Sequence, residues 1–287
     1  MELPRPAVVV ALLTPYERGG GGVDEGAMRA HVDWLVEAGV DGLMPCGTTG
    51  EGPLLSDDEV AAVVRATVAA ANGRVPVLAH VGRPGTAPTL ALARRAVDDG
   101  AAAVAAVAPY YYAAPDDHVR SHYNALIDGV DAPVYAYTIP SHTHRELAPE
   151  LLERLIGDGL AGLKDSTKSS ESHREYAVAV RTVGAPFALF TGTAGLMCEA
   201  LREGSAGAVL ALANLLPEPC VALARAIRDR RDEDARRLQA ELAAGDAQVR
   251  AAGGIPALKA AVAERIATYP PEVRAPLAPA PAGAAAA

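Results

Sequence analysis

Short apolar segments alternate with longer amphipathic segments along most of the chain. The apolar segments stop at glycine, proline or polar residues, and the stretches between them carry apolar positions at helical spacing, as in residues 24–39. Strands are expected at 7–13, 42–46, 75–81, 101–108, 133–138, 160–164, 187–191 and 207–211. Because a helical pattern follows each of them, the sequence predicts about eight β–α units and a parallel sheet covered by helices.

This number of units bears on the fold class and on the domain organisation. Eight units in one chain of 287 residues favour an α/β fold of the closed (β/α)8 TIM-barrel type over an open sheet. Two further helical patterns follow the eighth unit. We therefore expect a catalytic barrel domain over 1–230, a C-terminal helical extension over 231–275 and a disordered Pro/Ala-rich tail over 276–287.

Composition narrows the classes of partner. The chain is 50% hydrophobic and carries a net charge of −9, with arginines mixed among acidic residues rather than gathered in a basic stripe, which argues against nucleic acid. No apolar run reaches membrane-spanning length and no signal-peptide pattern is visible, so we expect no membrane association. Cys46, Cys198 and Cys220 are far apart and form no CxxC pair, which indicates neither disulfides nor a thiolate zinc site and favours a cytoplasmic location.

Lysine is rare in this chain, and one lysine stands where a strand is expected to end. Only three of the 26 basic residues are lysines, and Lys164 closes the segment 160–164. Arginine does not deprotonate in proteins, whereas a lysine can become a nucleophilic amine when burial lowers its pKa. The alternative is a lysine whose stem packs at a strand end while its ammonium reaches water. Active sites of such barrels lie at the C-terminal ends of the strands, which favours the nucleophile.

Two other polar features are expected at the same end of the barrel. Residues 47–51, Gly-Thr-Thr-Gly-Glu, form a turn whose backbone N–H groups and hydroxyls suit a small anion such as a carboxylate, unless it is an ordinary glycine-rich turn. The turn has neither Walker A nor dinucleotide-binding spacing. Tyr137 ends the strand before that of Lys164, so its phenol could relay protons to the amine, or else simply line the barrel wall.

A metal site is the main alternative chemistry. His142 and His144 form an HxH pair that could bind Zn²⁺ together with Asp165 or His80, although two exposed loop histidines are the more common outcome of such a pattern. A metal-dependent barrel enzyme therefore stays open as a hypothesis. The expected site contains no metal and no cofactor.

Six motifs in chain order resemble the dihydrodipicolinate synthase / N-acetylneuraminate lyase family of Schiff-base, pyruvate-handling aldolases. They are Thr14-Pro15, the turn 47–51, Pro109-Tyr110-Tyr111, Tyr137-Thr138-Ile139-Pro140, Gly162-Leu163-Lys164-Asp165 and Val273-Arg274-Ala275-Pro276-Leu277. Each motif alone is weak or moderate, but together they cover nearly the whole chain in the order that the family shows.

The resemblance implies a mechanism and a set of site residues. Lys164 forms an imine with pyruvate, or with a 2-oxo acid that is to be cleaved, and the imine stabilises an enamine. Tyr137 relays protons through Thr48, and Tyr111, lent by a neighbouring subunit, completes the relay in a homotetramer built as a dimer of dimers. The residues expected to bind substrate are Gly47, Thr49, His80, Thr138, His142 and Ala208.

Departures from the family pattern concern the aldehyde partner. His142 stands where dihydrodipicolinate synthases carry an arginine, and histidine cannot make a bidentate contact with a carboxylate. Thr138 replaces an asparagine, His80 adds a titratable donor in place of a glycine, and Thr48 speaks against the sialic-acid lyases, which have serine there. We therefore expect an aldolase or hydratase-aldolase (a hydro-lyase) acting on a 2-oxo acid such as a 2-keto-3-deoxy sugar acid. The alternatives are 4-hydroxy-tetrahydrodipicolinate synthase, which joins pyruvate and aspartate semialdehyde, and a non-catalytic 2-oxo-acid-binding protein.

Overall fold

A parallel β-barrel forms the centre of the molecule. Within residues 3–19 and 21–281, which the computed structural model describes, eight strands form one sheet in the order β2-β1-β8-β7-β6-β5-β4-β3. They are β1 (Ala7–Ala11), β2 (Gly42–Met44), β3 (Leu78–His80), β4 (Ala103–Val107), β5 (Val134–Thr138), β6 (Gly162–Asp165), β7 (Ala188–Thr191) and β8 (Gly207–Leu210). A parallel bridge between Leu43 and Val77 joins β2 to β3 and brings the two ends of the sheet together. The predicted (β/α)8 barrel is confirmed.

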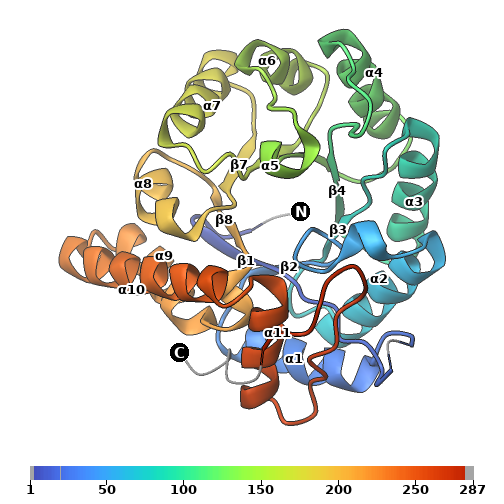
Figure 1. Cartoon of the computed structure of the whole chain (residues 1–287). Helices are drawn as coiled ribbons and strands as arrows, with labels where there is room; N and C mark the ends of the chain where they lie inside the picture. Colours follow the sequence, from blue (N-terminus) through green and yellow to red (C-terminus); the bar gives the residue numbers. More distant parts are fainter. Residues whose placement is uncertain (1–2, 20, 282–287) are drawn as a thin grey trace.

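Helices alternate with the strands and form the outer ring, as Figure 1 shows. They are α1 (Glu25–Glu37), α2 (Asp57–Ala71), α3 (Thr86–Asp98), α4 (Asp116–Ile127), α6 (Pro149–Gly157), α7 (Ser170–Val183), α8 (Met197–Arg202) and α9 (Pro217–Arg228). Local sequence fixes where several of them begin. Ser56 and Glu59 form a capping box at the start of α2, and Asp24 caps α1 by accepting a hydrogen bond from the N–H of Ala27.

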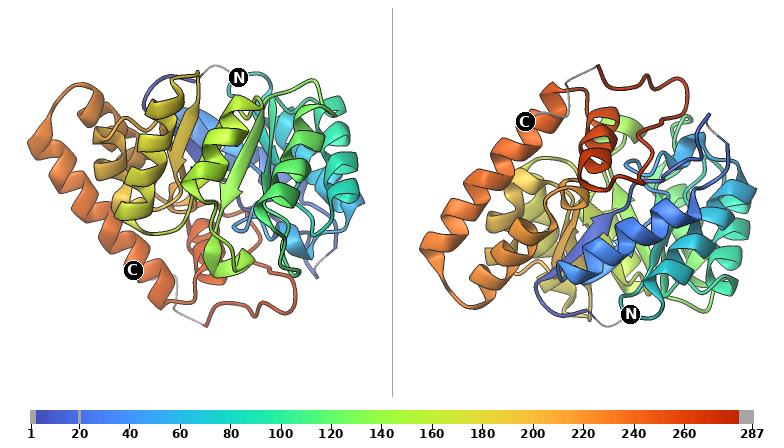
Figure 2. Two further views of the ribbon diagram at one scale, coloured as in Figure 1. Left: turned by 90° about the horizontal axis from the view of Figure 1, so that it is seen from above. Right: turned by 90° about the horizontal axis from the view of Figure 1, so that it is seen from below.

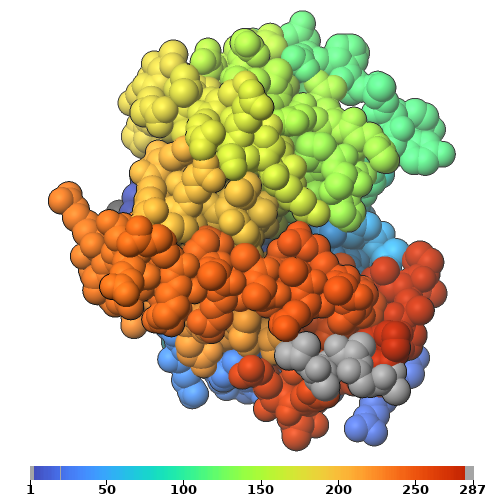
Figure 3. Space-filling view, turned by 60° about the vertical axis from the view of Figure 1, so that its left-hand side comes forward, coloured from blue at the N-terminus to red at the C-terminus, as the bar shows by residue number. Residues whose placement is uncertain are grey.

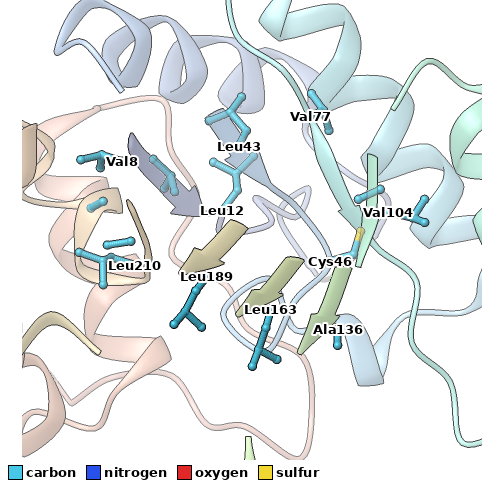
Figure 4. Close-up of a cluster of buried hydrophobic side chains, with 14 of the residues drawn as sticks. Val8, Leu12, Leu43, Cys46, Val77, Val104, Ala136, Leu163, Leu189 and Leu210 are labelled. Atoms are coloured by element: carbon cyan, nitrogen blue, oxygen red, sulfur yellow. The ribbon is translucent and has the colours of Figure 1, made fainter. Parts of the chain in front are cut away.

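Side chains along each strand alternate between two apolar layers. Val8, Leu163 and Leu210 point outward and pack against the helices, as do their neighbours in Figure 4. Val9 and Tyr137 belong to a second cluster that fills the barrel interior. Because side chains fill the interior, the polar chemistry is confined to the ends of the strands.

Two further helices follow the barrel. α10 (Asp232–Ala251) crosses the surface beside α9, and Figures 2 and 3 show it as a long band over this part of the molecule. α11 (Ile255–Arg265) buries Leu258 and Val262 against Leu13, which follows β1. The predicted boundary at residue 230 falls between α9 and α10, and the division into domains stays a prediction. Residues 276–281 of the predicted tail form neither helix nor strand, and 282–287 lie outside the described residues.

Two strands are shorter than the apolar pattern predicts, and both differences involve proline. The segment 75–81 becomes a strand only from Leu78, because Pro76 has no N–H to donate to a sheet. The segment 42–46 ends at Met44, since Pro45 follows it and Cys46 has a left-handed φ of 61°. No helix in the described part of the chain is long and apolar enough to cross a membrane.

Candidate active site

Lys164 lies inside the barrel at the C-terminal end of β6. Its side chain is buried, and its Nζ lies 4.0 Å from the centroid of the Tyr137 ring and 3.9 Å from the Sδ of Met44. Strand register sets this arrangement, because Lys164 pairs with Tyr137 on β5 and with Phe190 on β7. None of the ion pairs formed in the described part of the chain includes Lys164. The amine therefore meets an aromatic ring and a thioether instead of a counter-ion.

The glycine-rich turn after β2 is folded tightly against the first strand. Cys46, which precedes it, and Glu51, its last residue, have φ values of 61° and 58°. A Cβ on Gly52 would lie 1.8 Å from the carbonyl oxygen of Cys46, so only glycine fits there. The Thr14 hydroxyl at the exit of β1 donates to the carbonyl of Gly50 at 2.8 Å. These contacts hold residues 47–51 in one conformation at the end of the barrel.

Three of the predicted catalytic residues meet at this end. The Thr48 Oγ1 and the Tyr137 hydroxyl are 3.4 Å apart, and the Tyr137 ring in turn contacts the Lys164 amine. Gly47 and Thr49 lie in the same turn, and both are buried. The arrangement therefore brings together an amine, a phenol and an aliphatic hydroxyl, which are the groups that an imine-forming site needs for attack and proton transfer.

His80 supports this group from the end of β3. Its Nδ1 lies 3.1 Å from the carbonyl oxygen of Cys46, and a carbonyl only accepts, so Nδ1 carries the proton. Burial, followed by the charge of Lys164, lowers the His80 pKa to about 3, which keeps the ring neutral at pH 7. Its Nε2 is then a bare acceptor, and its ring packs edge-on to Tyr137 with centroids 5.8 Å apart. At neutral pH His80 is thus a neutral ring whose one N–H is used by Cys46, and a contact between substrate and its Nε2 stays a prediction.

Two predicted substrate-binding residues face away from Lys164. Thr138 pairs in register with Asp165, and because side chains alternate along β5, its hydroxyl points to the opposite side from Tyr137. Ala208 packs in the outer apolar layer with Leu210. A side-chain contact between substrate and either residue does not agree with this geometry.

His142 and Tyr111 lie at the surface. His142 is on the short helix α5 (Pro140–Thr143), which was not predicted, and its Nδ1 is 2.9 Å from the Ser141 hydroxyl. Partial burial, and then the charges of Lys168 and His144, lower the pKa of His142. Tyr111 follows β4, has a φ of 76° and is 84% exposed. The fold of a single chain thus leaves Tyr111 in solvent instead of beside Thr48.

The geometry gives the metal alternative little support. Asp165 points out of the barrel, where it accepts hydrogen bonds from the N–H and hydroxyl of Thr167 at 2.8 and 2.7 Å. Its other oxygen is 2.7 Å from the Nδ1 of His173, whose Nε2 is 2.7 Å from the Ser205 hydroxyl. Among residues 3–19 and 21–281, no three His, Cys, Asp or Glu side chains are placed to hold a metal ion. The carboxylate needed for the HxH site is already engaged in a buried network.

Sequence reasoning missed several residues around the site. Met44 contacts the amine, and His173 anchors the residue after Lys164. Lys259 and Arg274 approach the far side of the turn 47–51 from the C-terminal part of the chain. The sequence does single out Lys259 as one of only three lysines and Arg274 as part of the closing motif. Neither feature indicates which residues Lys259 and Arg274 contact.

A closed parallel barrel with an inward lysine on its sixth strand, beside a tyrosine and a threonine, has the architecture of the class I aldolases. The chain belongs to the dihydrodipicolinate synthetase family, whose model matches residues 5–285. It is therefore a carbon–carbon lyase of the class I aldolase type, from a family that uses pyruvate and an aldehyde.

Individual relatives agree with this assignment. The 4-hydroxy-tetrahydrodipicolinate synthase of Thermomicrobium roseum is 38% identical over 234 residues, which are 81% of this chain and 76% of that protein. YagE, a prophage protein of the dihydrodipicolinic acid synthase family from E. coli K12 solved in complex with pyruvate, matches with a TM-score of 0.94 at 25% identity, over 98% of this chain and 95% of that one. A structure described as a monomeric dihydrodipicolinate synthase variant matches with a TM-score of 0.91 at 25% identity, over 98% and 93% of the two chains.

Proposed function

We propose that Lys164 forms an imine with pyruvate and that the resulting enamine attacks aspartate semialdehyde, the reaction of a 4-hydroxy-tetrahydrodipicolinate synthase. Imine formation is supported by the position of the buried Lys164 amine, which lies 4.0 Å from the centroid of the Tyr137 ring. The hydroxyl of Tyr137 in turn lies 3.4 Å from that of Thr48. The names of the curated relatives support the aldehyde. They favour this alternative over our expectation of a sugar-acid aldolase.

The proposed steps use only groups of this chain and its substrates. The neutral amine of Lys164 attacks C2 of pyruvate, and loss of water gives a cationic imine. Removal of a proton from C3 gives the enamine, whose C3 bonds to the aldehyde carbon, and the amino group of the aldehyde part then attacks C2 and displaces the Lys164 amine, which closes the ring and releases the product. Tyr137 and Thr48 carry the protons of the addition and dehydration, while the turn that contains Gly47 and Thr49 holds the pyruvate carboxylate.

We also propose that a second copy of the chain completes the relay. Tyr111 and Tyr112 are 84% and 78% exposed, and their rings contact each other edge-on with centroids 5.0 Å apart. In a dimer within a homotetramer, the partner subunit's Tyr111 would reach the Tyr137–Thr48 pair. The three free, buried cysteines support our proposal of a cytoplasmic location.

A second candidate is cleavage of a 2-keto-3-deoxy sugar acid, and His142 is the observation that favours it. A histidine with a lowered pKa, exposed on α5, lacks the forked positive charge that binds the carboxylate of aspartate semialdehyde most strongly. A sugar-derived aldehyde needs no such group, because its hydroxyls bind to neutral donors and acceptors.

A substrate panel separates the two candidates. Pyruvate would be offered with aspartate semialdehyde, glyceraldehyde, glycolaldehyde and aromatic aldehydes, and 2-keto-3-deoxy acids would be tested for cleavage. We expect the highest kcat/KM with aspartate semialdehyde, and His142→Arg should raise it further. A higher kcat/KM for a 2-keto-3-deoxy acid, together with no gain from His142→Arg, would replace the first candidate with the second.

A further inference from the structure

A buried group of charges lies behind the turn 47–51, on the side away from Lys164. Glu51, the last residue of the turn, and Lys259 of α11 are both completely buried, with Oε1 and Nζ 2.6 Å apart. The contact is an ion pair by distance, although Oε1 receives no directed hydrogen bond among the described residues. The proposed reaction uses neither residue.

The C-terminal part of the chain engages both oxygens of Glu51. Oε1 meets Lys259, and Oε2 accepts a hydrogen bond of 2.8 Å from the backbone N–H of Arg274. Lys259 also donates to the carbonyl of Glu272 at 2.7 Å, which ties α11 to the residues that follow it. One carboxylate therefore connects the turn to α11 and to residues 269–277, which we name the C-terminal segment.

Aromatic and charged groups enclose this contact. The Lys259 Nζ lies 4.1 Å from the centroid of the Tyr16 ring, and the Arg274 guanidinium carbon lies 4.7 Å from the same centroid. Arg274 continues to Glu59 on α2 at 2.5 Å, so two cations face two carboxylates. Burial lowers the pKa of Lys259 to about 8, and the charge of Glu51 acts in the opposite direction. The ammonium is thus held in a buried site largely by this partner.

The position of Glu51 gives the group a role beyond holding α11 in place. Glu51 has a φ of 58°, a region that non-glycine residues avoid unless their surroundings hold them there. The N–H of Glu51 donates to the carbonyl of Thr48 at 3.1 Å. The orientation of Glu51 therefore affects that of Thr48, whose hydroxyl lies beside the hydroxyl of Tyr137. A shift of the carboxylate would move the hydroxyl of Thr48 and the backbone of Thr49.

We propose that Lys259 and the C-terminal segment are positioning elements: by holding Glu51 they set the turn that receives the carboxylate of the 2-oxo acid. This inference rests on the proposed function, in which that turn holds pyruvate. Binding of pyruvate and docking of the C-terminal segment are then coupled, and the coupling acts equally in both directions.

The substitution Lys259→Met tests one direction, because it removes the charge and keeps most of the side-chain volume. We expect KM for pyruvate to rise at least about tenfold, while saturating pyruvate still gives an imine on Lys164. The matched control is Arg95→Met, which breaks a surface ion pair with Asp58 and should leave KM unchanged. A folded Lys259→Met protein whose KM stays within about twofold of the wild type would overturn the proposal.

Hydrogen exchange of the wild-type protein tests the other direction and needs no variant. Amides of residues 269–277, including the N–H of Arg274, should exchange several-fold more slowly at saturating pyruvate, while the surface helix α10 should not change. Unchanged exchange of this segment in protein that borohydride traps as a pyruvate adduct on Lys164 would refute the coupling alone. If wild-type Lys164 gives no adduct, the proposed function fails first, and the coupling that rests on it fails with it.

Discussion

The regions around Lys164 and Lys259 place the same side chain in two opposite settings. Both lysines are buried, at 5% and 0% exposure. Lys259 has a carboxylate 2.6 Å from its Nζ and donates to a carbonyl, whereas Lys164 has an aromatic ring and a thioether. Lys259 therefore has a charged partner, whereas the Lys164 amine has none among the described residues.

The difference explains why only one of these lysines is suited to catalysis. The Lys259 amine is held 2.6 Å from the Glu51 carboxylate and donates to the carbonyl of Glu272, so it is not placed to attack a ketone. The Lys164 amine forms no ion pair among the described residues and lies over the ring of Tyr137, whose hydroxyl can carry protons, so its surroundings suit nucleophilic attack. Residues 47–51 lie between the two regions, with Thr48 next to the Tyr137 hydroxyl and Glu51 next to Lys259. The predictions below alter each region in turn.

The largest expected effect follows from removing the unpaired amine. Lys164→Met should lower kcat/KM by about 10³-fold or more, because no other group can form the imine. It should not weaken folding, since no ion pair is lost and an apolar side chain replaces a buried amine. Steady-state kinetics and urea unfolding of the same preparation check both statements. A destabilised protein with normal turnover would reverse our assignment of the two regions.

Tyr137→Phe removes one hydroxyl from the Lys164 region and leaves the ring in place. We expect kcat to fall by about 10²- to 10⁴-fold, the usual range for loss of a proton-transfer group. Tyr135→Phe, on the same strand and also inside the barrel but beside Phe190, is the matched control and should remain active. Equal losses in both variants would show that the phenol of Tyr137 has no special role.

In the Lys259 region we expect an effect on stability in addition to the effect on KM. Lys259→Met leaves the Glu51 carboxylate buried without its partner, which should lower the free energy of unfolding by about 3–5 kcal/mol. Removing both charges, as in Glu51→Gln with Lys259→Met, should restore part of that loss. Urea unfolding of the single and double variants measures the coupling. Additive losses would indicate that the two side chains do not act as a pair.

The smallest effect concerns acid stability, because each region contains a buried neutral histidine. His31 packs against Tyr269, and His80 lies beside Tyr137. Burial is the largest cause of the shift in both, and it lowers the pKa of His31 to about 4 and that of His80 to about 3. Both rings have a lower pKa in the folded protein than in the unfolded chain. Their favourable contribution to the free energy of unfolding is therefore complete above about pH 6.5, and it is lost as the pH falls toward the folded-state pKa values. Each histidine should therefore lower stability by about 1.4 kcal/mol per pH unit below that point.

Unfolding midpoints in urea between about pH 7 and pH 5 check this expectation. His31→Asn should make the pH dependence shallower, whereas the exposed His118→Asn should leave it unchanged. The same slope in all three proteins would show that acid denaturation does not depend on the buried ring.

The Lys164 region follows largely from the sequence, because its residues lie in local patterns. The strand with Lys164, the strand with Tyr137 and the glycine-rich turn are each visible as short segments, and barrel geometry brings their ends together. The directions of Thr138 and Ala208 also follow from strand alternation, once the register that puts Tyr137 and Lys164 inward is known.

The Lys259 region was not predictable in the same way. Glu51 and Arg274 are 223 residues apart, and α11 shows no pattern that indicates which buried group its lysine meets. The state of His80 depends on a single contact with the carbonyl of Cys46, which no sequence pattern reveals. Where a residue's role depends on one long-range contact, only the structure supplies it.

Borohydride reduction in the presence of pyruvate tests the central claim most directly. Reduction converts an imine into a stable secondary amine, so mass spectrometry of a digest can locate the modified lysine. We predict one pyruvate-derived adduct per chain, on the peptide that contains Lys164, with the peptide that contains Lys259 unmodified. An unmodified Lys164 peptide, or an adduct on Lys259 instead, would contradict the account.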